Sequence, residues 1–435
     1  MEVLKSWNRA ANFAKRRLSS RRSRRMIEQN AGELFHMPVG QERYQAALYF
    51  ADEMVNAYQI RQWYEPLKTL ALEVPTVVIA RNPETALALR DECPLPVFYA
   101  PTIVNLENLV DSQGLRIVYY VNQNIQNFQM MRFNKPNHVF LCHGESDKSY
   151  MWTNQLKAYD YVFSAGQAAI ERISEHLRNF DVQKHTKLVG RPQIDVAYAS
   201  PIELDSSRRT VLYAPTWEGD RPTMAYGSVV THGVKFIESL LADGQCNIIF
   251  RPHPRSGASS ASYGHAVQKI KTMLEQAAKT TSAVLYYDDS PEWGWQWDAA
   301  DICITDISAA AYDFLATGKP LFITKPNAED AEIANSWALS QIPALSTEHA
   351  LHVAEYVHEE IQAGGNDTRR LVNHYFGDVT PGASMTRFIR ASKELLDDSE
   401  HRQKDSDVES FAAPIAVNPR TGVSDPSPVR PPRAA

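Results

Sequence analysis

Four short polar clusters in the sequence carry residue types that bind anions and move protons. Each follows a run of apolar, β-forming residues; the clusters are His143-Gly144, Pro215-Thr216-Trp217, Arg251-Pro252-His253-Pro254 and Thr305-Asp306-Ile307-Ser308. Ligands of open α/β sheets bind beyond the carboxyl ends of the strands. Packing alone does not explain four polar clusters at four strand ends. The sequence therefore predicts that the clusters meet in one ligand-binding cleft.

Two of these clusters favour a phosphate site. Arg251 can bind a phosphate through two parallel hydrogen bonds, and His253 can donate to an oxygen or carry a proton. Ser308 precedes three alanines, as a helix N-cap does, and the free amides and dipole of a helix N-terminus favour an anion. A local carboxylate partner for Arg251 and ordinary capping by Ser308 are the alternatives.

His143 is the candidate general base. Gly144, Glu145, Asp147 and Lys148 follow it, and an imidazole held close to carboxylates can take a proton from an attacking hydroxyl. Gly144 would let a substrate approach the backbone. The alternative is a loop histidine without chemistry, and the anion site expected opposite His143 favours catalysis.

The alternating run Glu-Trp-Gly-Trp-Gln-Trp-Asp places three tryptophans at positions 293, 295 and 297. Such rings could stack on a base or a sugar. Three closely spaced aromatic residues are also typical of a packed loop. We favour packing and leave the three out of the predicted site.

The composition is that of a cytoplasmic enzyme with two domains. The chain has 435 residues, of which 44% are hydrophobic and 22% charged. The cysteines form no CxxC pair and no Cys/His cluster with zinc-ligand spacing, so we expect reduced, mostly buried thiols and neither metal nor cofactor. They are Cys93, Cys142, Cys246 and Cys303. We find no apolar stretch long enough to span a bilayer and no signal peptide.

Residues 1–30 are strongly basic and carry apolar residues at helical spacing. A cationic amphipathic helix of this kind can lie on an anionic membrane surface. A solvated basic leader or a nonspecific nucleic-acid patch is an equally weighted alternative. The membrane hypothesis predicts a peripheral protein on the inner face of the plasma membrane.

From about residue 44 the chain alternates strand-like and helix-like segments, which predicts doubly wound parallel sheets. Strands are expected at Val74–Ala80, Arg116–Val121, His138–Cys142, Tyr161–Ser164, Thr186–Val189, Thr210–Ala214, Asn247–Arg251, Ala283–Tyr287, Asp301–Thr305 and Pro320–Thr324. We expect two Rossmann-like domains, 44–200 and 205–383, on either side of a central cleft. A closing helix at 384–396 and a disordered, Pro-rich tail at 397–435 would follow.

The motifs, read in order, resemble the CDP-glycerol glycerophosphotransferase family of teichoic-acid biosynthesis. The matching segments are HGESDK (143–148), GRPQID (190–195), VLYAPTWEGD (211–220), FRPHP (250–254), ADICITDISAAAYDF (300–314) and HYFGDVTPGASMTRFI (374–389). The chain departs from the family pattern at Ala309, where a second serine is usual, at Glu145, and at Glu218, where a basic residue is usual.

The resemblance implies a GT-B-like α/β fold. It also implies transfer of glycerol phosphate, or a related polyol phosphate, from a CDP-activated donor to a hydroxyl of a lipid-linked cell-wall acceptor, with release of CMP. His143 and His253 would be catalytic. Donor and phosphate contacts would come from Thr216, Arg251, Thr305, Asp306 and Ser308, and acceptor contacts from Gly144, Lys148 and Asp195.

Two other functions remain open from the sequence. One is a GT-B glycosyltransferase that uses a nucleotide sugar. The other is a non-catalytic protein that binds membranes or nucleic acid on the same scaffold, although no specific nucleic acid is expected as a partner. The set of polar residues in the four clusters favours an enzyme over a binding protein.

Overall fold

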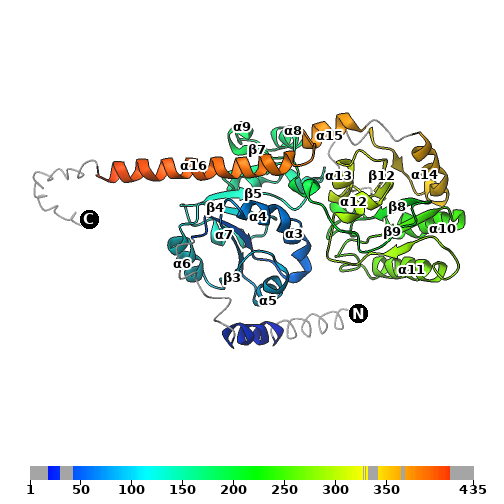
Figure 1. Cartoon of the computed structure of the whole chain (residues 1–435), viewed down its shortest axis with the longest axis horizontal. Coiled ribbons are helices and arrows are strands. Elements are labelled where there is room, and N and C mark those ends of the chain that lie inside the picture. The colour runs from blue at the N-terminus through cyan, green and yellow to red at the C-terminus, as the bar shows by residue number, and fades with distance from the viewer. Residues whose placement is uncertain are drawn as a thin grey trace, which may run out of the picture.

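The computed structural model describes residues 18–29, 43–326, 328, 330–331, 341–363 and 368–411, with backbone only at 399–411. It contains two parallel β-sheets, one in the N-terminal half of the chain and one in the C-terminal half (Figure 1). The seven-stranded sheet has the order β3-β2-β1-β4-β5-β6-β7 and the six-stranded sheet the order β10-β9-β8-β11-β12-β13. The strands are β1 (Ala46–Phe50), β2 (Thr76–Ala80), β3 (Val97–Tyr99), β4 (Ile117–Tyr120), β5 (Asn137–Phe140), β6 (Tyr161–Ser164), β7 (Thr186–Leu188), β8 (Arg209–Ala214), β9 (Cys246–Phe250), β10 (Leu285–Tyr287), β11 (Ile302–Thr305), β12 (Leu321–Thr324) and β13 (Ala344–Leu345).

Helices cover both faces of each sheet, which buries four apolar clusters. The α-helices are α3 (Ala57–Arg61), α4 (Tyr64–Ala71), α5 (Pro83–Glu92), α6 (Ile103–Gln113), α7 (Asn127–Met130), α8 (Gln167–His176), α9 (Val182–His185), α10 (Val234–Asp243), α11 (Ala261–Ala277), α12 (Trp295–Ala299), α13 (Ala309–Leu315), α14 (Val353–Gln362), α15 (Arg369–Phe376) and α16 (Ala383–Phe411). In the N-terminal half, α4, α5 and α16 pack on one face of the sheet and α6, α7 and α8 on the other. In the C-terminal half, α12, α13 and α15 pack opposite α10, α11 and α14.

The predicted parallel α/β architecture is confirmed, and all ten predicted strands are present. Three strands were missed: β1, β3 and β13. The missed strand β1 is central in its sheet, between β2 and β4. Its sequence, Ala-Ala-Leu-Tyr-Phe, begins with two alanines, which favour helix when considered alone. Burial on both faces of the sheet outweighs that local preference.

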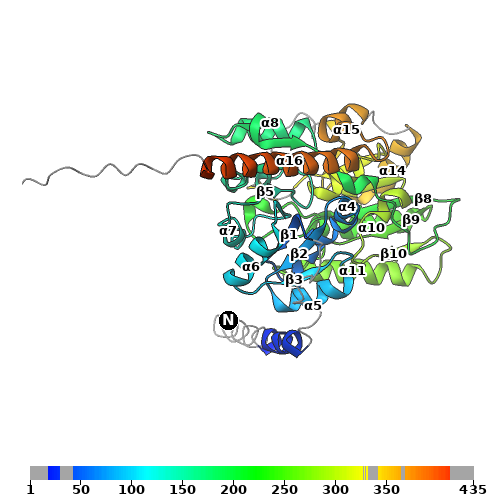
Figure 2. The same ribbon diagram turned by 60° about the vertical axis from the view of Figure 1, so that its left-hand side comes forward.

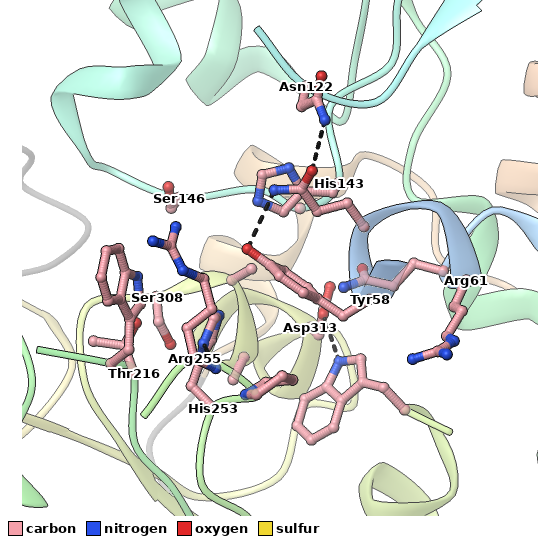
Figure 3. A pocket seen from close by; sticks show the side chains of 18 of the residues that line it. Tyr58, Arg61, Asn122, His143, Ser146, Thr216, His253, Arg255, Ser308 and Asp313 are labelled. Atoms are coloured by element: carbon pink, nitrogen blue, oxygen red, sulfur yellow. Dashed lines mark hydrogen bonds between the residues drawn. The ribbon is translucent and has the colours of Figure 1, made fainter. Parts of the chain in front are cut away.

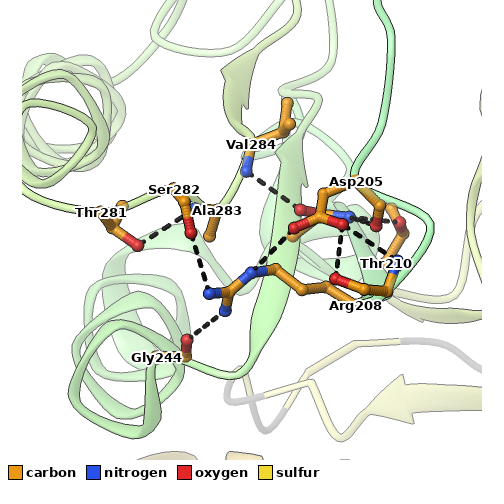
Figure 4. Close-up of polar contacts among 10 residues, drawn as sticks. Asp205, Arg208, Thr210, Gly244, Thr281, Ser282, Ala283 and Val284 are labelled. Atoms are coloured by element: carbon orange, nitrogen blue, oxygen red, sulfur yellow. Dashed lines mark hydrogen bonds and ion pairs between the residues drawn. The ribbon is translucent and has the colours of Figure 1, made fainter.

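A polar cluster fixes the amino-terminal edge of the second sheet (Figure 4). The Arg208 guanidinium donates to the Gly244 carbonyl at 2.7 Å, to Ser282 Oγ at 3.1 Å and to Asp205 at 3.2 Å. The Asn247 amide donates to the Asp205 carbonyl and accepts from the Val284 N–H. The cluster therefore ties the starts of β8, β9 and β10 together, far from the strand ends that carry the four predicted clusters.

The last helix differs from its prediction. We expected it to end at residue 396 and a disordered tail to begin at 397, but α16 continues to Phe411 and extends beyond the body of the protein (Figures 1 and 2). The segment after Leu396 is charged but contains no proline or glycine before Pro414, so helix propensity carries the helix onward. The rest of the predicted tail, 412–435, lies outside the described residues.

Part of the predicted basic leader is described. Residues 18–29 form a helix beneath the N-terminal half, and Ile27 from this helix is buried in an apolar cluster of that half (Figures 1 and 2). Residues 1–17, which carry most of the predicted apolar stripe, lie outside the described residues. None of the described helices is both long and apolar enough to cross a membrane.

Candidate active site

A cavity of about 730 Å³ lies between the two halves. It is lined by residues that follow β1, β4 and β5 of the first sheet and β8, β9 and β11 of the second. The predicted residues that line it are His143, Gly144, Lys148, Thr216, Arg251, His253 and Ser308. All four predicted clusters therefore contribute to one cleft, as expected from their positions at strand ends.

Three predicted site residues lie outside the cavity lining. The Asp306 carboxylate is buried behind the lining and accepts the N–H groups of Thr216 and Ser228, at 2.8 and 3.2 Å. Thr305 Oγ1 donates to the Ala214 carbonyl at 2.6 Å. Asp195 accepts the Met385 N–H at 2.7 Å, at the start of α16. These three side chains already form hydrogen bonds with backbone donors and acceptors. In the structure they therefore hold loops and helix ends in place.

His143 is held in one tautomer by the backbone. Its Nδ1 lies 3.0 Å from the Val121 carbonyl oxygen, which can only accept, so Nδ1 carries the proton. Nε2 is therefore the basic nitrogen. Burial lowers the pKa of His143 to about 4, although the hydrogen bond to Val121 opposes the shift. The imidazole is consequently neutral at pH 7 and able to accept a proton.

The backbone is strained at Cys142, the residue before His143, and this turn sets the direction in which His143 points. Cys142 has a φ of 58°, in the left-handed region that non-glycine residues rarely adopt. The Trp63 indole N–H donates to the Cys142 carbonyl at 2.6 Å and holds this turn. A side chain at Gly144 would collide with the Cβ of Ala309 in the opposite half. The glycine and the alanine together let the two halves meet beside the base.

The acidic residues after Gly144 do not hold His143, contrary to the prediction. Arg172 on α8 forms ion pairs with Glu145 and with Asp147, the latter at 2.6 Å. Asp147 also accepts the hydroxyl groups of Tyr312 and Tyr375, at 2.9 and 2.5 Å. All three charged side chains are less than 9% exposed. They form a buried link between the halves, because the tyrosines belong to α13 and α15.

A second buried ion pair also joins the halves at the wall of the cavity, which Asp313 lines. The Arg191 Nε donates to Asp313 of α13 at 2.7 Å, and Arg191 Nη2 reaches the His143 carbonyl at 3.3 Å. Asp313 in turn accepts the Trp293 indole N–H at 3.0 Å. Trp293 lines the cavity, whereas Trp295 and Trp297 are buried in the core. The prediction of a packed tryptophan run is thus correct for two of the three.

His253 has the opposite tautomer to His143. Its Nδ1 accepts the Arg255 backbone N–H at 3.1 Å, so the neutral ring carries its proton on Nε2 and can donate it. Burial, reinforced by the nearby cations Lys148 and Arg255, holds the pKa of His253 well below its usual range. Tyr58 lies between the two histidines, with ring centroids 5.8 Å from His143 and 5.0 Å from His253 (Figure 3).

The cationic side chains of the cavity differ in whether they already have an ionic partner. Arg251 Nη1 is bound to the buried Asp288 at 2.7 Å and to Ser290 at 3.1 Å, as in the alternative interpretation of this motif. Arg255 stacks over Trp217 at 3.9 Å and its buried Nε lacks a partner among the described atoms. Lys148 has no ion pair within the described part of the chain and reaches Thr216 Oγ1 at 3.4 Å. Arg255 and Lys148 therefore have donors available for an anion.

Sequence reasoning missed Arg255, Tyr58 and Trp293 as cavity residues. Arg255 directly follows the Arg-Pro-His-Pro motif, so its position beyond the same strand was a usable signal.

Ser308 stands at the N-cap position of α13 but makes no capping hydrogen bond, and its Oγ lies 3.4 Å from Thr305 Oγ1. Glu218, which departs from the family pattern, accepts the N–H groups of Gly257, Ser259 and Ser260 outside the cavity.

Comparison with known proteins agrees with this geometry. Residues 142–332 match the family model described as CDP-Glycerol:Poly(glycerophosphate) glycerophosphotransferase. No curated protein matches the sequence. The matched region contains His143, Arg251, His253 and Ser308, so it includes residues from both sides of the cavity.

Solved structures show the same architecture at low sequence identity. Two structures of the wall teichoic acid polymerase TagF each align with a TM-score of 0.56 and 13% identity. One alignment covers 83% of this chain and 90% of TagF, and the other 90% and 99%. A putative UDP-N-acetylglucosamine 2-epimerase from Listeria monocytogenes aligns with a TM-score of 0.54 and 10% identity, over 82% and 98%. At these identities the likeness establishes the GT-B-like fold.

The family-model match and the ordered motifs around one cleft agree on the classification. Over residues 142–332 the chain is similar to the CDP-glycerol:poly(glycerophosphate) glycerophosphotransferase family.

Proposed function

We propose that the protein transfers glycerol phosphate, or a related polyol phosphate, from a CDP-activated donor to a hydroxyl of a lipid-linked cell-wall acceptor. The observation that supports this most directly is the pair of opposite histidine tautomers beside unpaired cations. His143 presents a basic nitrogen, while His253, Arg255 and Lys148 present donors. One of the TagF structures was determined with CDPG, which is in keeping with a CDP-glycerol donor.

The geometry supports a direct displacement. His143 Nε2 would take the proton of the acceptor hydroxyl as its oxygen attacks the phosphorus that bears glycerol. The new P–O bond forms as the bond to CMP breaks, and the electron pair of that bond leaves on the CMP phosphate. His253 Nε2–H, Arg255 and Lys148 would stabilise the charge that develops on the transferred and leaving oxygens.

The direct test of the proposal is a donor panel with the full-length protein. CDP-glycerol, CDP-ribitol, a UDP-sugar and a GDP-sugar are compared by thermal shift and by nucleotide release. A ligand at one hundred times its Kd is expected to stabilise the protein by about 2.7 kcal/mol. We expect cytidine-selective stabilisation and CMP release. Consumption of a UDP- or GDP-sugar without CMP release from CDP-glycerol would support the nucleotide-sugar transferase instead.

The proposed role of Lys148 predicts how kcat/KM depends on pH. Burial lowers its pKa to about 8, against the opposing effect of Asp306. Raising the pH through 8 should therefore remove a cation from the cavity and lower kcat/KM, which reports on the free enzyme. The acidic limb should lie near pH 4, where His143 becomes protonated.

The matched variant for this profile is Lys148→Arg, which keeps the charge but does not lose its proton below about pH 12. We expect the fall in kcat/KM near pH 8 to disappear in this variant. An unchanged alkaline limb would show that Lys148 is not the group responsible.

We also propose that the basic N-terminal segment binds the inner face of the plasma membrane. In the described helix 18–29, Arg21, Arg22 and Arg25 are exposed. Each basic residue near an anionic surface contributes about 1 kcal/mol. Replacing these three arginines with glutamine should reduce sedimentation with anionic liposomes and leave the weak sedimentation with neutral liposomes unchanged. Equal sedimentation of both proteins with anionic liposomes would contradict the proposal.

A further inference from the structure

Three side chains of the types that bind transition metals meet at the amino-terminal edge of the second sheet. Asp243 is the last residue of α10, Cys246 begins β9, and His358 lies on α14, which packs beside α10 (Figure 1). A carboxylate oxygen, the thiol sulfur and an imidazole nitrogen of these residues all lie within 4.8 Å of one another. None of the three lines the cavity between the halves, so the cluster is separate from the candidate active site.

The orientation of the three side chains suits ligation of one ion. His358 Nε2 lies 3.0 Å from Asp243 Oδ2. The backbone N–H and the side-chain amide of Gln245 donate to the two oxygens of Asp243, each at 3.2 Å, and so fix the carboxylate as outer-shell donors do in metal sites. Cys246 is 2% exposed, and its thiol makes no hydrogen bond within the described part of the chain. Its sulfur is therefore available as a ligand.

An ordinary ion pair accounts for Asp243 and His358 but not for the sulfur beside them. Zn²⁺ binds sulfur, nitrogen and oxygen ligands tetrahedrally at about 2.0–2.3 Å, which places neighbouring ligand atoms about 3.3–3.6 Å apart. The side chains of His358 and Asp243 are 30% and 17% exposed, so small rotations can bring the cluster to this geometry. The cluster as it stands is therefore close to the arrangement that the ion requires.

The local charges also permit a divalent cation. Arg208 and Arg209 stand beside the start of β9 in the sheet, and each is already paired with an aspartate (Figure 4). Arg208 is bound to Asp205 at 3.2 Å, and Arg209 is bound to Asp301 at 3.0 Å. The Asp243 carboxylate and a thiolate would then supply two negative charges, and the imidazole would bind as a neutral ligand. Thiolate and imidazole ligands select a transition metal over Mg²⁺ and Ca²⁺, which prefer oxygen.

We infer that Asp243, Cys246 and His358 bind one divalent transition-metal ion of the zinc type. Zn²⁺ deprotonates a thiol that it binds, so ligation forms the metal–sulfur bond and releases the thiol proton to solvent. A water molecule would fill the fourth position on the exposed side. The ion would link the end of α10, the start of β9 and α14, and so stabilise the C-terminal half independently of the proposed function. The sequence pattern did not predict this site, because His358 is more than a hundred residues from the other two ligands.

The test begins with full-length protein that has been treated with EDTA and returned to metal-free buffer. Zn²⁺ is added in isothermal titration calorimetry and in thermal shift, and Mg²⁺ is the comparison. We expect one Zn²⁺ per chain and a rise in Tm of about 2 °C or more at one hundred times the Kd, with no response to Mg²⁺. Absence of Zn²⁺ binding, or equal binding of both ions, would overturn the inference.

Variants assign the ion to this cluster. Cys246→Ser and His358→Ala should each weaken Zn²⁺ binding by about 100-fold or more, because loss of even an outer-shell group costs about 10- to 100-fold. The matched controls are Cys93→Ser and His352→Ala, which change a cysteine and a histidine outside the cluster and should leave the Kd unchanged. Unaltered Zn²⁺ affinity in Cys246→Ser and His358→Ala would mean that the ion binds adventitiously elsewhere.

Cobalt gives a test that does not depend on the folding of a variant. Co²⁺ added to the unmodified protein in place of Zn²⁺ should produce a thiolate-to-metal charge-transfer band in the near ultraviolet and the strong visible bands of four-coordinate Co²⁺. Zn²⁺ should abolish both by displacing the cobalt. A cobalt spectrum without the charge-transfer band would contradict ligation by Cys246 and overturn the inference.

Discussion

Replacing His143 with alanine is expected to slow glycerol phosphate transfer by about 10²- to 10⁴-fold while leaving CDP-glycerol binding largely intact. Among the described residues that line the cavity, His143 is the histidine whose Nε2 the backbone leaves free to act as a base, and the variant removes it. The groups with donors for the phosphates, Arg255 and Lys148, remain in place. Single-turnover CMP release measures the rate, and calorimetry with CDP-glycerol measures the affinity.

Two further variants make this result specific. Arg255→Ala should show the reverse pattern and weaken CDP-glycerol binding by about 10- to 100-fold, because a hydrogen bond to a charged group contributes about 1.5–3 kcal/mol. His265→Ala, at an exposed position on α11, should change neither quantity. Similar, small effects from His143→Ala and Arg255→Ala would contradict the proposed division of roles.

Replacing Arg172 with alanine is expected to lower the free energy of unfolding by about 3–5 kcal/mol. The variant leaves Glu145 and Asp147 buried without their cation, at 4% and 0% exposure. The hydroxyl groups of Tyr312 and Tyr375 still reach Asp147 but cannot neutralise two carboxylates. Urea denaturation followed by circular dichroism measures the change.

The control for this prediction is Arg178→Ala, which removes an arginine from an exposed position two residues beyond α8. It should change the free energy of unfolding by less than about 0.5 kcal/mol. A loss for Arg172→Ala no larger than that of the control would mean that the buried cluster does not stabilise the link between the halves.

The sequence allowed the fold and the location of the cleft to be predicted because both depend on local patterns. Apolar strand runs alternate with helical segments, and polar residues stand at the strand ends; His143, Thr216, Arg251 and His253 all line the cavity as expected. Strand β1 was not predicted, because its burial depends on tertiary packing rather than on its own residues.

The predicted partners of these residues were less accurate, since a partner distant in the chain leaves no local pattern. The acidic residues beside His143 pair instead with Arg172, 25 and 27 positions away. Asp306 follows a strand in the expected place, yet the backbone of the neighbouring loop occupies its carboxylate. Arg255 was overlooked because its role depends on Trp217, which lies after a different strand.

The return of α16 to the N-terminal half constrains the order in which the protein can fold. Phe388, Ala391 and Leu395 of this helix are buried in the same apolar cluster as Trp63, Tyr119 and Phe163. During synthesis, the first sheet is complete roughly two hundred residues before these side chains leave the ribosome, at about 5–20 residues per second. For about 10–40 seconds the nascent chain therefore exposes an apolar face of that sheet, which makes it a natural client for a chaperone.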